Sequence, residues 1–424
     1  MATLKLGSVD SEFLPKNKTK YLSPFHQSLN DTLKRKGMFR DEDQWRSFIP
    51  IDGKEVREVQ QFLENTGFLR AGNVDGIFGY RTRAGVRLFQ EYVRSIEGFE
   101  YKKGGIPGIG TPDGMVGKGT RFHMKRWEEE KLFCEWGKAS SDNPSEEYTK
   151  WLNILKDTKK HFQEKAHKII AKSDEYNTKL AKKNIKSDTR LLKDWTYGKD
   201  EIHLIGIRRN EDLKRSEVRE NDDIFIFLLN GMVFKFWGST DPNPGLKSTR
   251  KDEPFMIEGQ HLYKLAWHMR SKATKAYQAL KPLSGAGPLV FRDVTGNDAL
   301  TEENMQRGLQ GPNNSINIHW SGVGSWNFSA GCQVIAGKSY INHLDQVVDC
   351  SSYAAKNNDA LTKKAGQRRL TKGAYNVVAD LVSVYRPEGV NTVIYTLGRD
   401  NNLDNSKQFK KGHARKLLKR MKNV

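Results

Sequence analysis

The sequence predicts a multidomain protein: a small all-α domain, a helical linker and an α+β, mostly-β domain. Three observations lead to this prediction. The chain has 424 residues, which exceeds the usual size of one domain. Apolar residues recur at helical spacing between residues 56 and 94, whereas short β-like runs separated by turns follow residue 200. Charged residues make up 29% of the chain, so polar segments are expected between the cores.

These patterns divide the chain into five segments. They are an N-terminal arm at 1–48, a helical domain with a partial repeat at 49–136, a helical linker at 137–199, a mostly-β domain at 200–399 and a basic tail at 400–424. The arm is expected to be irregular, with a short helix around 27–36. The tail is expected to be an exposed or helical electrostatic anchor.

The charge is strongly positive, with 71 Lys and Arg against 51 Asp and Glu, a net charge of +20. Such a charge attracts polyanions, among them nucleic acids and anionic wall polymers. The sequence contains no zinc finger, no helix-turn-helix pattern and no basic groove interleaved with aromatic residues. A nucleic-acid partner is therefore not expected, because the positive charge is the only feature that favours one.

Targeting and cysteine patterns narrow the class further. The first 13 residues have no apolar core, so no secretory signal is expected, and no run of 18 apolar residues predicts a membrane span. A wall enzyme without a signal would be carried by a particle or released by lysis. The cysteines are Cys134, Cys332 and Cys350, an odd number without a Cys-x-x-Cys pair. We therefore expect no disulfide framework, no metal site and no cofactor.

The predicted helical domain contains two apolar helical patterns joined by a turn at 72–76. Asp75-Gly76 favours a tight turn because glycine adopts positive φ at little cost. Gly79 allows close backbone approach, and Thr82 can cap the following helix. Phe78 would close a small core.

The runs at 59–63, 75–82 and 86–90 resemble the small helical peptidoglycan-binding domain. The resemblance implies wall binding, carried by Asp75, Gly76, Phe78, Gly79 and Thr82. The stretch 113–120 repeats the D-G-x-x-G-x-x-T pattern 38 positions later (113 − 75). Three interpretations stay open: two half-modules in tandem, one module with an insertion at 98–112, or two turns that only connect helices.

The segment from 148 to 192 has apolar residues at mostly helical spacing, with Lys and Glu between them, and predicts a coiled or packed spacer. After residue 200 the pattern becomes β-like. Asn230-Gly231 predicts a type I′ hairpin over 224–237. Further strands are expected at 203–207, 288–293, 315–319 and 391–397, and helices at 259–272 and 373–384.

The chemistry-bearing segment is a short strand that ends in His319, followed by a glycine-rich loop that ends in Cys332. A cysteine nucleophile needs a base within hydrogen-bond reach and surroundings that favour the thiolate. The separation of 13 positions (332 − 319) suits a loop that returns the cysteine beside the strand end. Gly331 would leave room for substrate and for backbone N–H donors facing an oxyanion.

His319 and Ser329-x-Gly331-Cys332 resemble the motif of the L,D-transpeptidase (YkuD-like) family. The resemblance implies attack by Cys332 on a stem-peptide carbonyl, with His319 as base and the N–H groups around Gly331 stabilising the oxyanion. An amine or water would then resolve the acyl-enzyme. Ala330 and Val334 depart from the family pattern, which usually has His and Arg or Asn there. A carboxypeptidase, an endopeptidase or a wall-binding protein without activity therefore stays open.

The order of upstream elements resembles that of phage and contractile-injection proteins, which implies tail or injection-particle partners. The elements are a Thr-Asp-Pro turn at 240–242, a Gly-x-His element, an Arg-Asp pair, the Ile-His strand and Ser-x-Gly-Cys-Gln. The resemblance implies substrate contacts by five residues: His261, Arg292, Asp293, Trp320 and Gln333.

Each of these residues also has a structural interpretation. Cys332 can be a buried core cysteine, and His319 can simply end a core strand. His261 and His268, seven positions apart on an expected helix, can both be structural. Arg292 and Asp293 can form a local ion pair instead of a clamp in which Arg292 holds a substrate carboxylate.

Overall fold

The computed structural model describes residues 2–14, 16, 47–165, 167–209, 220–243, 252–268, 276–296, 301–361, 370–403, 409 and 412–424. The expected helix at 27–36 lies outside these residues. The chain forms two compact units. The first unit comprises Met1–Ala139, Met269–Tyr277 and Tyr353–Arg386, and the second comprises Ser140–His268, Gln278–Ser352 and Pro387–Val424.

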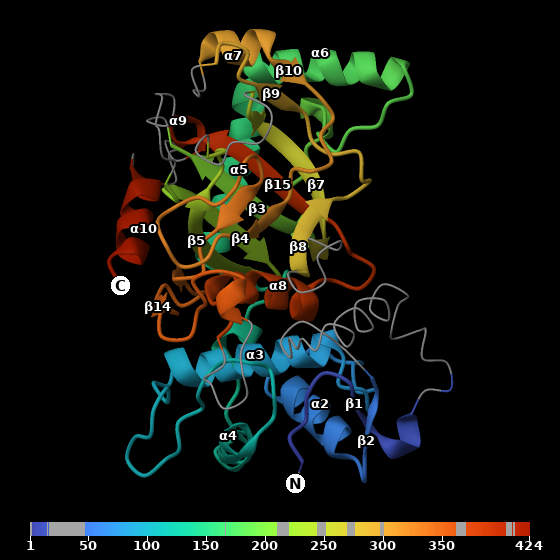
Figure 1. Cartoon of the computed structure of the whole chain (residues 1–424), viewed down its shortest axis with the longest axis vertical. Coiled ribbons are helices and arrows are strands. Elements are labelled where there is room, and N and C mark those ends of the chain that lie inside the picture. Colours follow the sequence, from blue (N-terminus) through green and yellow to red (C-terminus); the bar gives the residue numbers. More distant parts are fainter. Residues whose placement is uncertain are drawn as a thin grey trace. The chain divides into compact units, whose positions relative to one another are not determined.

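The first unit is helical (Figure 1). Its core is an aromatic cluster in which Phe68, Phe89 and Trp127 pack with ring centroids 5.3–5.5 Å apart. These side chains lie on or beside the helices that the apolar periodicity predicted. The helices are α2 (Glu55–Asn65), α3 (Tyr80–Ser95), α4 (Lys118–Glu129) and α8 (Ala374–Tyr385), and two short strands, β1 (Ser8–Asp10) and β2 (Ile49–Ile51), pair in parallel.

The described start of the chain is ordered, so the prediction of an irregular arm is wrong for residues 2–14. The buried carboxylate of Asp10 accepts hydrogen bonds from the backbone N–H groups of Val56 at 2.9 Å and Arg57 at 3.0 Å. A carboxylate at a helix N-terminus satisfies donors that lack a partner within the helix. Asp10 therefore caps α2 from 46 positions away, a contact that local sequence patterns do not reveal.

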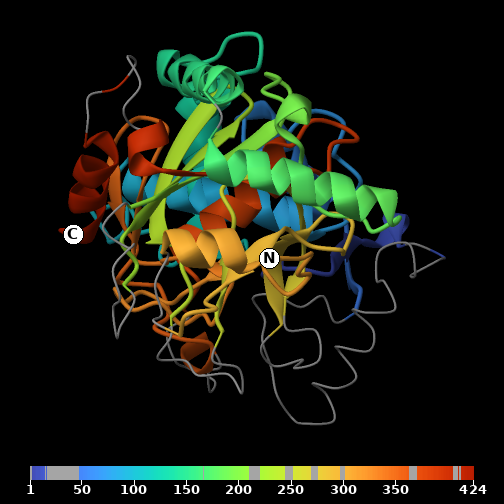
Figure 2. The same ribbon diagram turned by 90° about the horizontal axis from the view of Figure 1, so that it is seen from above.

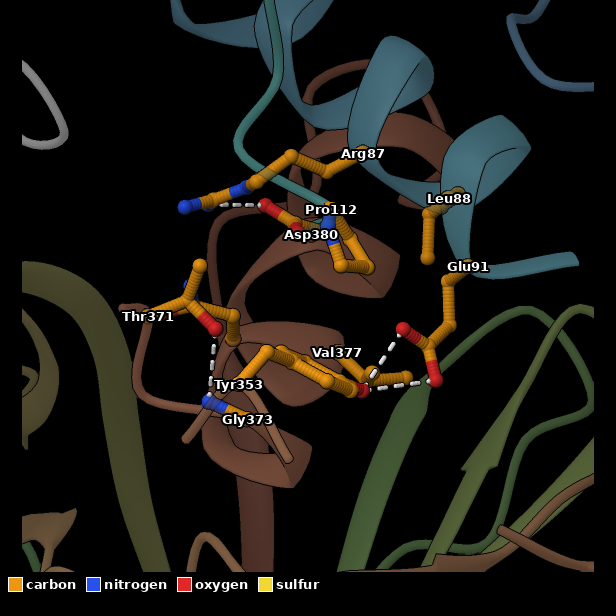
Figure 3. Close-up of a pocket in the computed structure, with 10 residues that line it drawn as sticks. Arg87, Leu88, Glu91, Pro112, Tyr353, Thr371, Gly373, Val377 and Asp380 are labelled. Carbon is orange, nitrogen blue, oxygen red and sulfur yellow. Dashed lines mark hydrogen bonds and ion pairs between the residues drawn. The ribbon is translucent and has the colours of Figure 1, made fainter. Parts of the chain in front are cut away.

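Helix α3 is buried on nearly all sides, including its charged residues, because α8 covers its polar face. Arg87 forms an ion pair with Asp380, and Glu91 accepts a hydrogen bond from the Tyr353 hydroxyl at 2.7 Å (Figure 3). These partners lie in 353–386, which was predicted to belong to the domain at 200–399. The structure instead makes this segment part of the first unit, since it neutralises charges that α3 buries.

The second unit is built on a large sheet of short strands. Their order is β12-β11-β8-β7-β15-β3-β4-β5-β13-β14, and β12 also pairs with β5, so the sheet closes on itself. The strands are β3 (Ile202–Arg208), β4 (Asp223–Leu229), β5 (Met232–Ser239), β7 (Gly259–His268), β8 (Tyr277–Pro282), β11 (Ile318–Trp320), β12 (Gln333–Ile335), β13 (Ser339–Ile341), β14 (Val347–Asp349) and β15 (Val393–Arg399).

The predicted hairpin is confirmed as β4 and β5, whose turn residues Asn230 and Gly231 have φ values of 50° and 77°. Two positive φ values are what a type I′ turn requires. The helix expected at 259–272 is wrong over its described part, because 259–268 forms β7. Pairing of β7 with β15, in which Tyr263 lies opposite Val393, overrides the helical propensity of Leu, Lys and Ala.

A small second sheet consists of β6 (Pro254–Met256), β9 (Val290–Arg292) and β10 (Leu309–Gln310). Helices α6 (Lys168–Lys182) and α7 (Glu302–Arg307) lie side by side over it (Figures 1 and 2). Leu180 of α6 packs with Phe255 and Phe291 of the sheet.

Helices α5 (Glu146–Glu164) and α10 (His413–Lys422) both pack into the core of the second unit. Trp151 and Leu155 of α5 are buried there, so the predicted linker at 137–199 contributes to this core. In α10 the residues at i, i+3, i+4 and i+7 are buried, which makes the basic tail an amphipathic core helix. None of the helices among the described residues has the length and apolar character needed to cross a membrane.

Candidate functional site

The first turn of the helical module is organised around a buried glutamine. The side-chain carbonyl of Gln60 accepts hydrogen bonds from the N–H groups of Asp75 and Gly76 at 3.0 and 2.9 Å. Its amide group donates to the Ile77 carbonyl at 3.1 Å and to the Thr82 hydroxyl at 3.0 Å. Gln60 therefore ties α2 to the turn and to the start of α3.

The second turn has the same arrangement around Gln90. Its side chain accepts a hydrogen bond from the Gly114 N–H at 2.8 Å and donates to the Met115 carbonyl at 2.9 Å and the Thr120 hydroxyl at 3.0 Å. Gly76 and Gly114 have φ values of 72° and 77°, a backbone conformation that favours glycine.

The partial repeat is therefore also a structural repeat. Helix α3 begins at the first turn and carries Gln90 for the second, so the two half-modules share this helix. The glutamine precedes the turn aspartate by 15 positions in the first copy and by 23 in the second, and the longer connection includes 98–112.

The residues predicted to carry wall binding have mainly structural positions. Gly76, Phe78 and Thr82 are buried, Gly79 immediately precedes α3, and Asp75 is exposed. The N–H and carbonyl of Phe78 pair with Ser8 and Gly7 at 2.8 and 3.0 Å. The polar groups of these residues bond within the module and hold it together, and the wall contact expected of them stays a prediction.

The second candidate site lies at the paired strands β11 and β12. The strands are parallel, with His319 opposite Val334, and Cys332 immediately precedes β12. The Cys332 thiol donates to the Ser315 carbonyl at 3.1 Å. Asn317 directs two donors at the sulfur, its backbone N–H at 3.4 Å and its side-chain amide at 3.7 Å.

Cys332 and His319 shift each other's pKa in opposite directions. Burial raises the pKa of Cys332, but the hydrogen bond and charge of His319, with Asn317, outweigh it, so the pKa of this thiol is below its ordinary value. Burial lowers the pKa of His319, but the hydrogen bond and charge of Cys332 outweigh it, and the pKa is raised. Both shifts favour a thiolate–imidazolium pair.

The Trp320 carbonyl orients the His319 ring. It lies 2.9 Å from Nδ1 of His319, and because a carbonyl only accepts, Nδ1 carries a proton. In the neutral ring, Nε2 is then the nitrogen that can take up a proton. Trp320 was predicted to contact substrate, but its side chain is buried, and its described role is this backbone hydrogen bond.

His268 is a second histidine at this site. Its ring stacks on that of His319 with centroids 4.6 Å apart and an interplanar angle of 18°. Burial, followed by the charges of His319 and Lys281, lowers the pKa of His268 to about 3, so this ring is neutral at neutral pH. A neutral ring can pack against the His319 imidazolium without charge repulsion.

His261 does not reach this site. Its buried ring nitrogens lie 3.0 Å from the Thr189 hydroxyl and 3.0 Å from the Ile257 carbonyl, and burial lowers its pKa to about 3. Side chains alternate between the two faces of a strand, so positions seven apart on β7 point to opposite faces. The helical prediction placed His261 and His268 on one face and was wrong for this reason.

Other predicted contact residues are engaged within the fold. Arg292 donates to the Asp252 carbonyl at 2.8 Å, and Asp293 accepts from the Asn304 side chain at 2.7 Å and the Gly296 N–H at 2.9 Å. Gln333 is buried and donates to the Thr240 carbonyl at 2.9 Å. Each of these side chains therefore stabilises a turn or a strand, and the substrate contacts expected of them stay predictions.

Two of the backbone N–H groups expected to face an oxyanion have partners within the fold. The N–H groups of Gly331 and Gln333 bond to the Ser329 hydroxyl at 3.3 Å and the Asn317 carbonyl at 2.9 Å. Ser329 thus shapes the turn before the cysteine. A Cβ on Gly331 would lie 2.8 Å from Pro254, so glycine here permits packing against β6 instead of leaving room for substrate.

Sequence reasoning found Cys332 and His319 but missed the roles of Asn317 and His268. Asn317 stands two positions before His319, and side chains at i and i+2 share a strand face. That spacing was the available indication for Asn317. For His268 the available indication was its odd separation from His261, which places the two side chains on opposite faces of a strand. This indication can be applied only once the segment is recognised as a strand.

The comparisons with known proteins bear on the first unit. The family described as "Putative peptidoglycan binding domain" matches residues 52–94, which span α2, the first turn and most of α3. The match supports peptidoglycan binding, as expected from the runs at 59–90, and peptidoglycan as a partner. No curated protein and no solved structure matches the chain.

Substitution of Gln60 tests the role of the buried glutamine. Gln60→Ala leaves the polar groups of the first turn without their partner, so we expect the first unit to lose about 1–3 kcal/mol of stability. The measurement is its thermal or denaturant unfolding transition in the full chain, with retention on purified sacculi as a second measurement. The control is Gln61→Ala, which removes an exposed neighbour; an equal loss in both variants would contradict the assigned role.

Alkylation of Cys332 as a function of pH tests the thiolate–imidazolium pair. Because the pKa of Cys332 is lowered, we expect its reaction with iodoacetamide to reach half its maximal rate at a pH below the ordinary thiol range. His319→Ala removes the main stabilising group and should move this midpoint upward. Cys134 and Cys350 are buried, and burial raises the pKa of Cys134 to about 12, so labelling should be selective. A midpoint that His319→Ala leaves unchanged would refute the pair.

Proposed function

We propose that the chain processes peptidoglycan, with the module at 52–94 binding the wall and Cys332 acting on a stem-peptide bond through an acyl-enzyme. The observation that carries the proposal is the position of Cys332 immediately before β12, beside the strand β11 that holds His319, together with the opposite pKa shifts of the two groups. Shifted pKa values of this kind are typical of cysteine nucleophiles paired with a base. The wall-binding match supplies the substrate class.

The proposed reaction has two steps. The Cys332 thiolate attacks a stem-peptide carbonyl carbon, a C–S bond forms, and the C–N bond breaks as His319 donates its proton to the departing amine. Water or a second amine then attacks the thioester, His319 accepts the proton of the attacking group, and the thiolate leaves. Attack by water gives hydrolysis, and attack by a second amine gives exchange of the peptide bond.

Asn317 is the proposed donor to the oxyanion that forms in both steps. Its side-chain amide lies 3.7 Å from the sulfur and therefore close to any carbonyl bonded to that sulfur. The same amide donates to the Ser315 carbonyl at 2.9 Å, which orients it so that its other N–H faces the Cys332 sulfur and Nδ1 of His268, 3.5 Å away. Donors arranged in advance around developing charge contribute strongly to catalysis.

The finer assignment to L,D-transpeptidase-like chemistry rests on His319 and Ser329-x-Gly331-Cys332. Val334 is buried in β12 opposite Ser239, so this position offers no polar side chain to a substrate. Ala330 is exposed and equally apolar. These two positions favour a second candidate, a non-catalytic wall-binding component of a phage tail or contractile injection particle.

Turnover of purified muropeptides separates the two candidates. We expect the wild type to cleave or exchange a stem-peptide bond, detected by chromatography and mass spectrometry of the products. Cys332→Ala and His319→Ala should each lose at least about a thousandfold in rate, because they remove the nucleophile and its base. His161→Ala, which removes an exposed histidine of the second unit, is the control.

Binding of the same variants to sacculi completes the test. Cys332→Ala should be retained as well as the wild type, since the module at 52–94 is intact. Retention of the wild type without any turnover would remove the enzyme proposal and leave the non-catalytic candidate.

A further inference from the structure

The loop before Cys332 displays two large aromatic side chains to solvent. Trp326 is 42% exposed and Phe328 is 49% exposed, and their rings contact each other edge to face with centroids 5.2 Å apart. The residues that alternate with them, Asn327 and Ser329, are buried. The loop therefore turns its polar side chains inward and its apolar side chains outward, the reverse of the usual preference.

Buried asparagines fix this inverted arrangement. Asn221 donates to the Gly324 carbonyl at 2.9 Å and the Trp326 carbonyl at 3.1 Å. Asn327 donates to the Asp241 carbonyl at 2.5 Å and accepts from the Ser329 N–H at 2.8 Å. Hydrogen bonds from these buried amide groups to the loop carbonyls favour one backbone conformation, and in this conformation the two aromatic rings are exposed.

A further asparagine closes the loop on the side of the cysteine. The side chain of Asn243 donates to the Asn327 carbonyl at 2.7 Å, and its N–H donates to the Ser329 carbonyl at 2.7 Å. Phe328 precedes Cys332 by four positions. The Cα atom of Phe328 therefore lies within about 14 Å of the Cα atom of Cys332.

We propose that Trp326 and Phe328 bind a sugar ring of the glycan strand that carries the stem peptide. The inference rests on the proposed function and names its substrate class as the glycan-linked stem peptide. A pyranose ring has an apolar C–H face that packs on the electron-rich face of an aromatic ring, as edge hydrogens do in aromatic pairs. Because the two aromatic rings lie at an angle to each other, one can pack against the face of the sugar ring and the other against its edge.

The geometry of the substrate agrees with this assignment. A peptide bond two to four residues from the sugar lies roughly 7–14 Å from it in an extended stem peptide. The chain length allows Phe328 and Cys332 to be separated by a distance within this span, up to about 14 Å. Two side chains are also a small patch compared with the several hundred Å² that mark a protein docking surface, so a single sugar ring is the occupant we favour.

The test compares two substrates that differ only in the sugar. We expect the wild type to act on a disaccharide-linked stem peptide with a higher kcat/KM than on the same free peptide. Trp326→Ala and Phe328→Ala should each lower the ratio of the two values by roughly tenfold, an effect of the size that loss of a stacking aromatic ring has on nucleic-acid bases. Trp326→Phe should retain most of the ratio.

The control is Leu344→Ala, which removes an exposed apolar side chain from another turn of the second unit and should leave the ratio unchanged. In Trp326→Ala and Phe328→Ala, the pH midpoint of Cys332 alkylation should stay as in the wild type. An unchanged midpoint would show that the loop before Cys332 keeps its shape. Equal losses on both substrates, or no loss on either, would overturn the inference.

A binding measurement keeps the inference independent of turnover. The disaccharide without peptide should shift the indole N–H resonance of Trp326, assigned by its loss in Trp326→Phe, and should do so in Cys332→Ala as well. If the wild type turns over neither substrate, the proposed function fails while this titration still decides the inference. Absence of any shift at millimolar disaccharide would refute sugar binding at this loop.

Discussion

The parallel pairing of β11 and β12 is the constraint on which the candidate active site depends. These strands are only three residues long, yet their register sets the position of His319 relative to the loop that ends in Cys332. The pairing of β12 with β5 closes the sheet and leaves no room at this point, since a Cβ on Gly238 would lie 1.8 Å from the Val334 carbonyl oxygen. A shift of register would therefore separate His319 from Cys332.

Both candidate sites are held by buried amide side chains. In the first unit Gln60 and Gln90 each bond to the polar groups of a turn that glycine makes possible, and in the second unit Asn327 fixes the loop before Cys332. Amides suit this task because each one both donates and accepts, so it can replace the missing partners of an irregular backbone without introducing charge. Buried amide side chains of this kind occur where α2, α3 and the sheet are followed by loops.

The features that sequence predicted well are those that local chemistry determines. Asn230-Gly231 specifies its turn, the aspartate-glycine turns repeat visibly, and Cys332 follows a glycine-rich loop after His319. The features it missed depend on distant partners. β7 is a strand because β15 lies beside it, 130 positions away at Tyr263 and Val393, and Asp10 caps a helix across the predicted arm. Asn317 has a role only because the sulfur lies next to it.

The central claim is that Cys332 carries the acyl group of a stem peptide during the reaction. Rapid acid quenching of the protein with a stem-peptide donor, followed by intact-mass measurement and peptide mapping, tests it directly. We predict a mass increase equal to the acyl part of the donor, located on the peptide that contains Cys332 and absent in Cys332→Ala. Stem-peptide turnover without such an adduct, or an adduct elsewhere in the chain, would contradict the account.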